Sequence, residues 1–244
     1  MKENKYDDQA FFDKYSQMDR SKKGLAGAGE WHQLKKMLPH FKGKRVLDLG
    51  CGFGWHCEYA IEQGASAVVG IDLSEKMLEQ AKAKPHAGQI DYRCMAIEDI
   101  SFLPASFDIV ISSLAFHYIK SFQEICQKVR LFLGQGGHFV FSVEHPIFTA
   151  QGREDWYYDS NGKAAHWPVD HYFDESLRKT VFLGEEVVKY HKTLTTYLNT
   201  LLQNGFQLTE IIEPQPSDEL LHSVPGMEEE LRRPMMLLIS AKSV

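Results

Sequence analysis

Short apolar runs alternate with amphipathic segments along the middle of this chain. Each run is long enough for one buried strand, and each amphipathic segment has apolar residues at helical spacing. The predicted strands cover residues 44–49, 67–72, 88–95, 107–113 and 137–143. The predicted helices between them cover residues 54–63, 75–83 and 122–133. This alternation predicts an α/β fold with a doubly wound, mostly parallel sheet.

The pattern resumes near the end of the chain and is weaker at its start. The predicted C-terminal elements are a helix at 191–203 and strands at 206–213 and 235–241. Residues 1–43 precede the sheet. Their helical segment, 31–38, follows a glycine-containing piece, 23–29, that we expect to be flexible.

Three glycines follow the first predicted strand at alternate positions, Gly50, Gly52 and Gly54. A strand, a glycine turn and a helix N-terminus place backbone N–H groups against a ligand that must approach closely. The second strand ends in Asp72, and 72 − 54 = 18 positions separate it from the last glycine. That spacing is close to the roughly 20 typical of a carboxylate that binds ribose hydroxyls. These features predict a nucleoside-bearing ligand.

Two residues distinguish between the possible nucleoside ligands. Asp48 lies inside the first strand, where its carboxylate would repel a pyrophosphate and attract an ammonium group. Trp55 occupies the position at which a dinucleotide-binding loop has its third glycine. Both observations favour S-adenosylmethionine over NAD.

The stretch 46–54, Val-Leu-Asp-Leu-Gly-Cys-Gly-Phe-Gly, resembles motif I of the class I S-adenosylmethionine-dependent methyltransferases. Stretches that resemble later motifs of that family follow in order at 70–74, 96–100, 107–113 and 136–141. The resemblance implies a Rossmann-like seven-stranded sheet with an antiparallel last strand. It also implies S-adenosyl-L-methionine as cofactor and S-adenosyl-L-homocysteine as product.

The resemblance and the charges together assign the cofactor contacts. The expected residues are Tyr15, Arg20, Asp48, Gly50, Cys51, Gly52, Asp72, Leu73, Ala96, Ile97, Glu98 and Ser113. Asp72 is expected at the ribose, Leu73 and Ile97 at the two faces of adenine, and Arg20 or Tyr15 at the methionine carboxylate. Where the family often has Asp, this chain has Ala96. The partner of the adenine amine is therefore left open between Glu98, Asp99 and backbone.

Three residues at predicted strand ends are candidates for acid–base chemistry. Glu144 and His145 follow the fifth strand, and His117 follows the fourth. A histidine near neutral pH could take a proton from an acceptor hydroxyl or amine. Each could equally have a structural role.

Residues 146–190 form an insertion that is rich in aromatic side chains. Trp156, Tyr157, Tyr158, Trp167, Tyr172 and Phe173 fall within 18 positions. We expect a lid over the acceptor pocket, with a hairpin of 172–182 and 187–191 around Gly184; a packed cap or a dimer contact is the alternative. The expected division is therefore 1–43 helical cap, 44–145 cofactor-binding core, 146–190 lid, and 191–244 the rest of the core.

Composition limits the possible partners. The net charge is −6 and no lysine/arginine tract is present, so neither nucleic acid nor a membrane is expected as a partner. The polar start of the chain has no apolar signal core, the four cysteines form no C-x-x-C pair, and the histidines of the insertion have no metal-ligand spacing. We expect a cytoplasmic protein without a metal, as a monomer or homodimer.

The expected function is transfer of a methyl group to a small-molecule acceptor, at oxygen or nitrogen, by in-line displacement. A non-catalytic S-adenosylmethionine sensor is the first alternative, and an NAD-dependent oxidoreductase is the second. The acceptor itself does not follow from the sequence.

Overall fold

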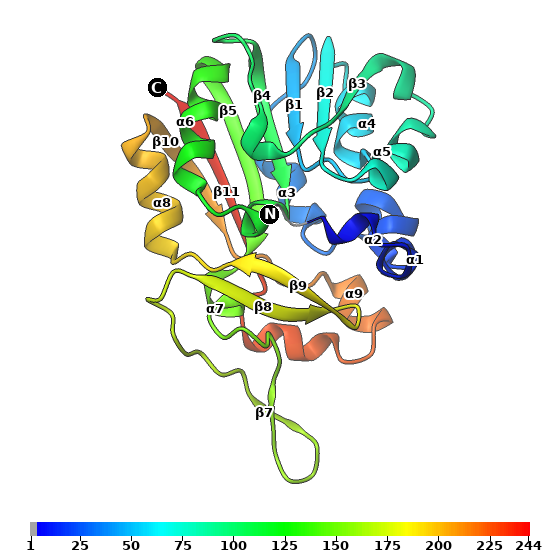
Figure 1. Ribbon diagram of the computed structural model, residues 1–244, viewed down its shortest axis with the longest axis vertical. Coiled ribbons are helices and arrows are strands. Elements are labelled where there is room, and N and C mark those ends of the chain that lie inside the picture. The colour runs from blue at the N-terminus through cyan, green and yellow to red at the C-terminus, as the bar shows by residue number, and fades with distance from the viewer. Residues whose placement is uncertain (1–3) are drawn as a thin grey trace.

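The computed structural model describes residues 4–244, so the first three residues of the expected N-terminal cap lie outside it. One seven-stranded sheet has the order β10-β11-β5-β4-β1-β2-β3 (Figure 1). Its strands are β1 Arg45–Leu49, β2 Ala67–Asp72, β3 Ile90–Cys94, β4 Phe107–Ser113, β5 Leu133–Glu144, β10 Phe206–Ile212 and β11 Met236–Ser243. Strand β11 is antiparallel to both neighbours, and the other ladders are parallel. The predicted doubly wound sheet with an antiparallel last strand is confirmed.

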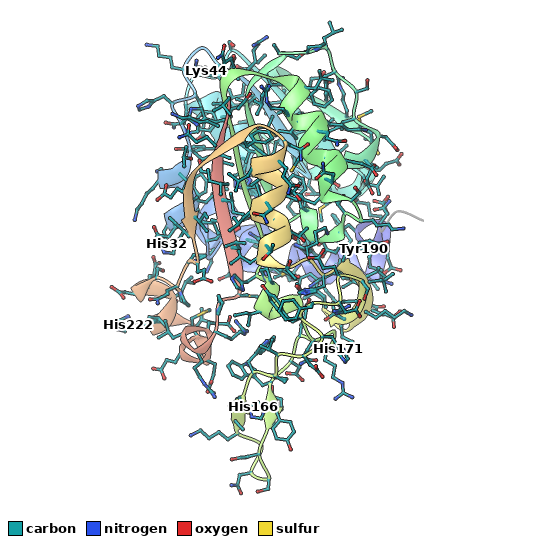
Figure 2. The ribbon with its side chains drawn as sticks, turned by 90° about the vertical axis from the view of Figure 1, so that its left-hand side faces the viewer. His32, Lys44, His166, His171, Tyr190 and His222 are labelled. Atoms are coloured by element: carbon teal, nitrogen blue, oxygen red, sulfur yellow. The ribbon has the colours of Figure 1, made fainter. Side chains whose placement is uncertain are left out.

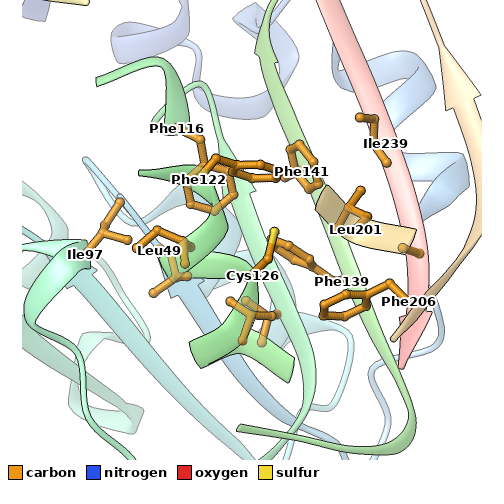
Figure 3. Close-up of a cluster of buried hydrophobic side chains, with 14 of the residues drawn as sticks. Leu49, Ile97, Phe116, Phe122, Cys126, Phe139, Phe141, Leu201, Phe206 and Ile239 are labelled. Atoms are coloured by element: carbon orange, nitrogen blue, oxygen red, sulfur yellow. The ribbon is translucent and has the colours of Figure 1, made fainter. Parts of the chain in front are cut away.

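Helices cover both faces of this sheet. On one face lie α3 Trp31–Met37, α4 Trp55–Glu62 and α5 Glu75–Lys82; on the other lie α6 Phe122–Phe132 and α8 Leu194–Gln203. The side chains of β5 alternate between the two faces, as a strand requires. Phe139 and Phe141 pack with α6 and α8 (Figure 3), and Val140 packs with α3. Burial on both faces explains why the central parallel strands β1 and β4 are nearly continuous apolar runs.

The N-terminal segment and the connections contain the shorter helices. These are α1 Gln9–Ser16, α2 Asp19–Lys22, α7 Pro146–Thr149 and α9 Asp218–Ser223, with 3₁₀ turns at Lys5–Asp7, Gly24–Gly27, Ala87–Gln89, Ile97–Asp99, Phe116–Tyr118 and Met227–Arg232. None of the helices within residues 4–244 has the length and apolar character needed to cross a bilayer.

Three local expectations differ from the structure. The piece 23–29 is not an open linker, because a 3₁₀ turn at Gly24–Gly27 packs Gly24 against the ring of Trp55. Strand β5 begins at Leu133, directly after α6, and not at residue 137; its pairing with β4 shifts register between Leu133 and His138. Helix α8 begins at Leu194 and not at residue 191, because Thr193 is its N-cap and accepts from the N–H of Thr196.

The insertion contains two small hairpins. The second, β8 Leu177–Phe182 with β9 Glu185–Tyr190, confirms the predicted hairpin around Gly184, although its first strand starts five residues later than expected. The first, β6 Tyr157–Tyr158 with β7 Ala164–His166, projects from the body of the molecule (Figure 1). Figure 2 shows His166 on this arm and His222 on the separate C-terminal segment. Within the described part of the chain, no group of three or more His, Cys, Asp or Glu side chains could hold a metal ion.

Candidate active site

A cavity of about 220 Å³ lies at the carboxyl edge of the sheet. Its floor is formed by the loop after β1 and by the ends of β2, β4 and β5. Its roof is the N-terminal segment, which contributes residues between Asn4 and Ala28. The expected cofactor residues that line it are Tyr15, Arg20, Gly50, Cys51, Gly52, Asp72, Leu73, Ala96, Ile97, Glu98 and Ser113. Eleven of the twelve are therefore brought together around one cavity.

The glycine loop is tied to the end of β2. The N–H of Gly52 donates to the Asp72 carboxylate at 2.8 Å, and the N–H of Ser74 donates to the other oxygen at 2.9 Å. Burial raises the pKa of Asp72 to about 6, although these two hydrogen bonds act against it. Gly52 has a φ of +52°, and no atom lies within 4 Å of the place a Cβ would take. Open space at this glycine leaves room for a ligand to approach the backbone.

A buried ion pair lies at the opposite wall. Arg20 donates to Glu30 at 2.6 Å, and the hydroxyl of Ser113 donates to the same carboxylate oxygen at 3.2 Å. Glu30 is only 1% exposed, whereas Arg20 reaches the cavity. Burial opposes the ionisation of Glu30, but Arg20 more than offsets it and holds the pKa of Glu30 below its usual value. Arg20 is thus an ionised, pre-positioned cation in the wall.

His117 and Glu144 lie together at the far end of the cavity. Nδ1 of His117 accepts from the backbone N–H of Glu144 at 3.4 Å, so the ring proton is on Nε2. Burial lowers the pKa of His117 to about 4, which keeps the imidazole neutral at physiological pH. Both side chains line the cavity, as expected for groups at strand ends.

The hairpin β8–β9 sends a lysine to Glu144. Nζ of Lys189 lies 2.6 Å from the carboxylate of Glu144 and 2.7 Å from that of Glu154. All three side chains are largely buried. The insertion therefore supports the acid at the end of β5 through a shared ammonium group.

Comparisons with known proteins agree with this geometry. Residues 47–141 match the family described as a methyltransferase domain. A crystal structure from Listeria monocytogenes, described as an S-adenosylmethionine-dependent methyltransferase, is 60% identical, covers 91% of this chain and 99% of its own, and has a TM-score of 0.86. Another, from Mesorhizobium loti, is 46% identical over 90% of this chain and 100% of its own, with a TM-score of 0.83. An uncharacterized protein from Haemophilus influenzae is 34% identical over 98% of this chain and 96% of its own. The chain belongs to the class I S-adenosylmethionine-dependent methyltransferases.

The wall of this methyltransferase fits its methyl donor, S-adenosylmethionine. The open glycine at position 52 and the carboxylate of Asp72 suit a ribose that must lie close to the backbone. Arg20 is the one lysine or arginine among the described residues of the wall, and Glu30 already holds it. A pyrophosphate would therefore find few cationic partners, which argues against the NAD alternative.

Asp48 does not line the cavity of the methyltransferase, contrary to expectation. Its side chain is 1% exposed and accepts a hydrogen bond from the thiol of Cys57 at 3.4 Å. Burial raises the pKa of Asp48 to about 7. A residue inside β1 points alternately to the two faces of the sheet, and at position 48 that direction leads to α4 and not to the cavity.

His145 also lies outside the cavity. Its Nδ1 accepts from the N–H of Ile147 and caps α7, while Nε2 lies 2.8 Å from the carboxylate of Glu213. The ring is 3% exposed. The placement of His145 therefore agrees with a structural role at the exit from β5 and not with a base in the cavity.

The aromatic residues expected to form a lid lie elsewhere. Trp156, Trp167 and Phe148 pack with Arg233, whose guanidinium lies 4.3 Å from the Trp167 ring centroid. Phe173 is 90% exposed. Among the described residues of the insertion, Phe182 alone lines the cavity.

Several wall residues were missed by the sequence analysis. Tyr6, Tyr118 and Phe182 carry no local signal, because aromatic residues at such positions are usually core. Lys189, which contacts Glu144 from behind the wall, did carry a local signal. It lies on the same buried face of β9 as Val187, and a lysine at an apolar-face position needs a partner.

Proposed function

We propose that this methyltransferase acts on a small organic acceptor, at an oxygen or nitrogen atom. The acceptor end is the part of the cavity lined by Tyr6, Tyr118, His117, Glu144 and Phe182. The observation that carries the proposal is the roof above it. The hydroxyl of Tyr6 lies 3.1 Å from that of Tyr118, so the N-terminal segment meets the turn after β4 over this part of the cavity, which supports a small acceptor.

The N-terminal segment is held closed by contacts from two sides. The hydroxyl of Ser74 donates to Asp7 at 2.6 Å, and Glu185 at the hairpin tip lies 3.3 Å from Lys5 and 3.6 Å from Lys14. A closed roof excludes water and limits the orientations of the acceptor. These contacts support a site built for a ligand that is fully enclosed during transfer.

The chain's own residues have two tasks in the proposed reaction. When bound, S-adenosylmethionine supplies an electrophilic methyl group that needs no activation by the protein. His117 can donate its Nε2–H, and Glu144 can accept a hydrogen bond, so the two orient an acceptor. Most of the rate would come from holding the nucleophile about 3–3.5 Å from the methyl carbon.

A nucleic-acid acceptor is the second candidate. A tRNA U34 carboxymethyltransferase from Hahella chejuensis is 28% identical over 57% of this chain. The net charge of −6 and the roof that the N-terminal segment forms over the acceptor end favour the small molecule.

The test is formation of S-adenosylhomocysteine with fractionated cell extract, followed by mass spectrometry of the methylated product. We expect methyl transfer in the low-molecular-mass fraction and none in the tRNA fraction. Transfer only to tRNA would overturn the choice of acceptor. Binding of S-adenosylmethionine without turnover in any fraction would favour the sensor alternative.

A further inference from the structure

We propose that the acceptor is a small amine, which the enzyme recognises through the carboxylate of Glu144 and the ring faces of the tyrosines around it. This inference rests on the proposed function and names the chemical class of its substrate.

The acceptor end is short of positive charge. Glu144 and Glu154 share the single ammonium group of Lys189, at 2.6 and 2.7 Å. Arg20 is held by Glu30, and no further lysine or arginine occurs among the described residues of the wall. A carboxylate or phosphate acceptor would be buried there without a cationic partner, at a large cost. A cation would instead meet the carboxylate of Glu144, which lines the cavity.

The protonation of Glu144 and Glu154 also allows a cation to bind beside them. Burial and the neighbouring Glu144 raise the pKa of Glu154 to about 8, so Glu154 holds a proton at neutral pH. Burial also opposes the ionisation of Glu144, but His117 and Lys189 more than offset it and hold its pKa below the usual value. A cation bound beside Glu144 would favour ionisation of Glu154 as well. The pair can therefore balance one further positive charge.

Aromatic rings surround the same space. The centroid of Tyr6 lies 5.1 Å from that of Tyr15 and 6.2 Å from that of Tyr118, and these rings and Phe182 all line the cavity. A ring face attracts a cation that lies within about 6 Å of its centroid. A neutral hydroxyl gains no comparable attraction from the ring faces.

The chemistry of transfer also favours nitrogen. The ammonium ion bound beside Glu144 first gives one proton to water. The neutral amine then forms the new N–C bond with its lone pair, while the methyl–sulfur bond breaks and its electron pair stays on sulfur. The positive charge moves to nitrogen beside Glu144, and the product ammonium later gives its proton to water. A hydroxyl would have to give a proton to a base. His117, whose pKa burial lowers to about 4, is a poor one.

The test uses three matched probes, n-propylamine, n-propanol and propionate, titrated into the full-length protein saturated with S-adenosylhomocysteine. Binding is followed by ligand-observed NMR at pH 7. We expect n-propylamine to bind at least tenfold more tightly than the other two. Glu144→Gln should remove that preference, while Glu186→Gln, an exposed change on the same hairpin, should keep it.

Two tyrosine variants separate the ring face from the hydroxyl. Tyr118→Phe should retain n-propylamine binding, and Tyr118→Leu should weaken it at least threefold. Equal binding of the three probes, or an unchanged preference in Glu144→Gln, would overturn the inference. So would a Glu144→Gln variant that loses affinity for S-adenosylmethionine but not for S-adenosylhomocysteine, because Glu144 would then serve the sulfonium.

Cofactor binding by the wild-type protein is measured first. A protein that binds neither S-adenosylmethionine nor S-adenosylhomocysteine overturns the proposed function and this inference with it. A protein that binds both but does not prefer n-propylamine overturns only the inference.

Discussion

The backbone N–H of Gly52 donates a 2.8 Å hydrogen bond to the carboxylate of Asp72. This contact joins the loop after β1 to the end of β2, two places that lie 20 residues apart in the chain. The group that we expect at the ribose therefore also positions the loop that lies against the rest of the cofactor. Loss of the Asp72 carboxylate should therefore affect both the ribose contact and the position of the glycine loop.

Asp72→Ala should weaken S-adenosylmethionine binding about tenfold or more, because a hydrogen bond to a charged group is typically worth about 1.5–3 kcal/mol. Isothermal titration calorimetry measures the change. Asp91→Ala is the matched control, since Asp91 is exposed on β3 and pairs with Arg93. Unchanged affinity in Asp72→Ala would remove this residue from the site.

Asp48→Asn should change how stability depends on pH. Burial raises the folded-state pKa of Asp48 from 3.8 to about 7. Folding therefore favours the protonated form of Asp48. The contribution of this form to the free energy of unfolding is lost as pH rises from about 4 through about 7. The neutral asparagine side chain does not titrate. The free energy of unfolding of Asp48→Asn should therefore rise by roughly 1–3 kcal/mol relative to that of the wild type between pH 5 and pH 8. Urea unfolding at the two pH values measures it; parallel pH profiles would contradict the assignment.

Arg20→Met should lower both stability and cofactor affinity. Glu30 would be left buried without its partner, which typically costs about 3–5 kcal/mol. The double variant Arg20→Met/Glu30→Gln should recover most of the stability but not the affinity. Thermal unfolding and calorimetry separate the two effects.

A second ligand tests whether Arg20 binds the methionine carboxylate. The double variant should bind S-adenosylmethionine at least tenfold more weakly than wild type but should bind 5′-methylthioadenosine, which has no carboxylate, with similar affinity. An equal loss for both ligands would place Arg20 away from the amino-acid end.

His145→Ala should leave cofactor affinity and turnover within about twofold of wild type, because the ring lies outside the cavity. It should lower the free energy of unfolding by about 1 kcal/mol, a typical effect of losing a helix N-cap. Steady-state kinetics and urea unfolding provide the two measurements. A large loss of turnover in a folded variant would restore His145 as a base.

The insertion shows where sequence reasoning reached its limit. The hairpin around Gly184 was predictable from its turn and its alternation. Its contribution to the site was not, because β8 has polar Arg178 and Thr180 on its buried face and exposes Val181. An aromatic-rich segment can equally cover a ligand or pack against the rest of the protein. Here Trp156 and Trp167 pack against Arg233 and not against the cavity.

The sequence by itself determined the sheet, the glycine loop and Asp72, because these depend on short-range periodicity and on fixed spacings within one βαβ unit. Only the tertiary structure decided which groups close the cavity. Tyr6 meets Tyr118 across 112 residues and Lys189 meets Glu144 across 45, and contacts between such distant segments are set by packing and charge pairing, not by local pattern. The same physics turned His145 away from the site, since Glu213 from a distant strand end holds its ring. Asp48 is different, because strand alternation alone directs it to Cys57 on the neighbouring helix.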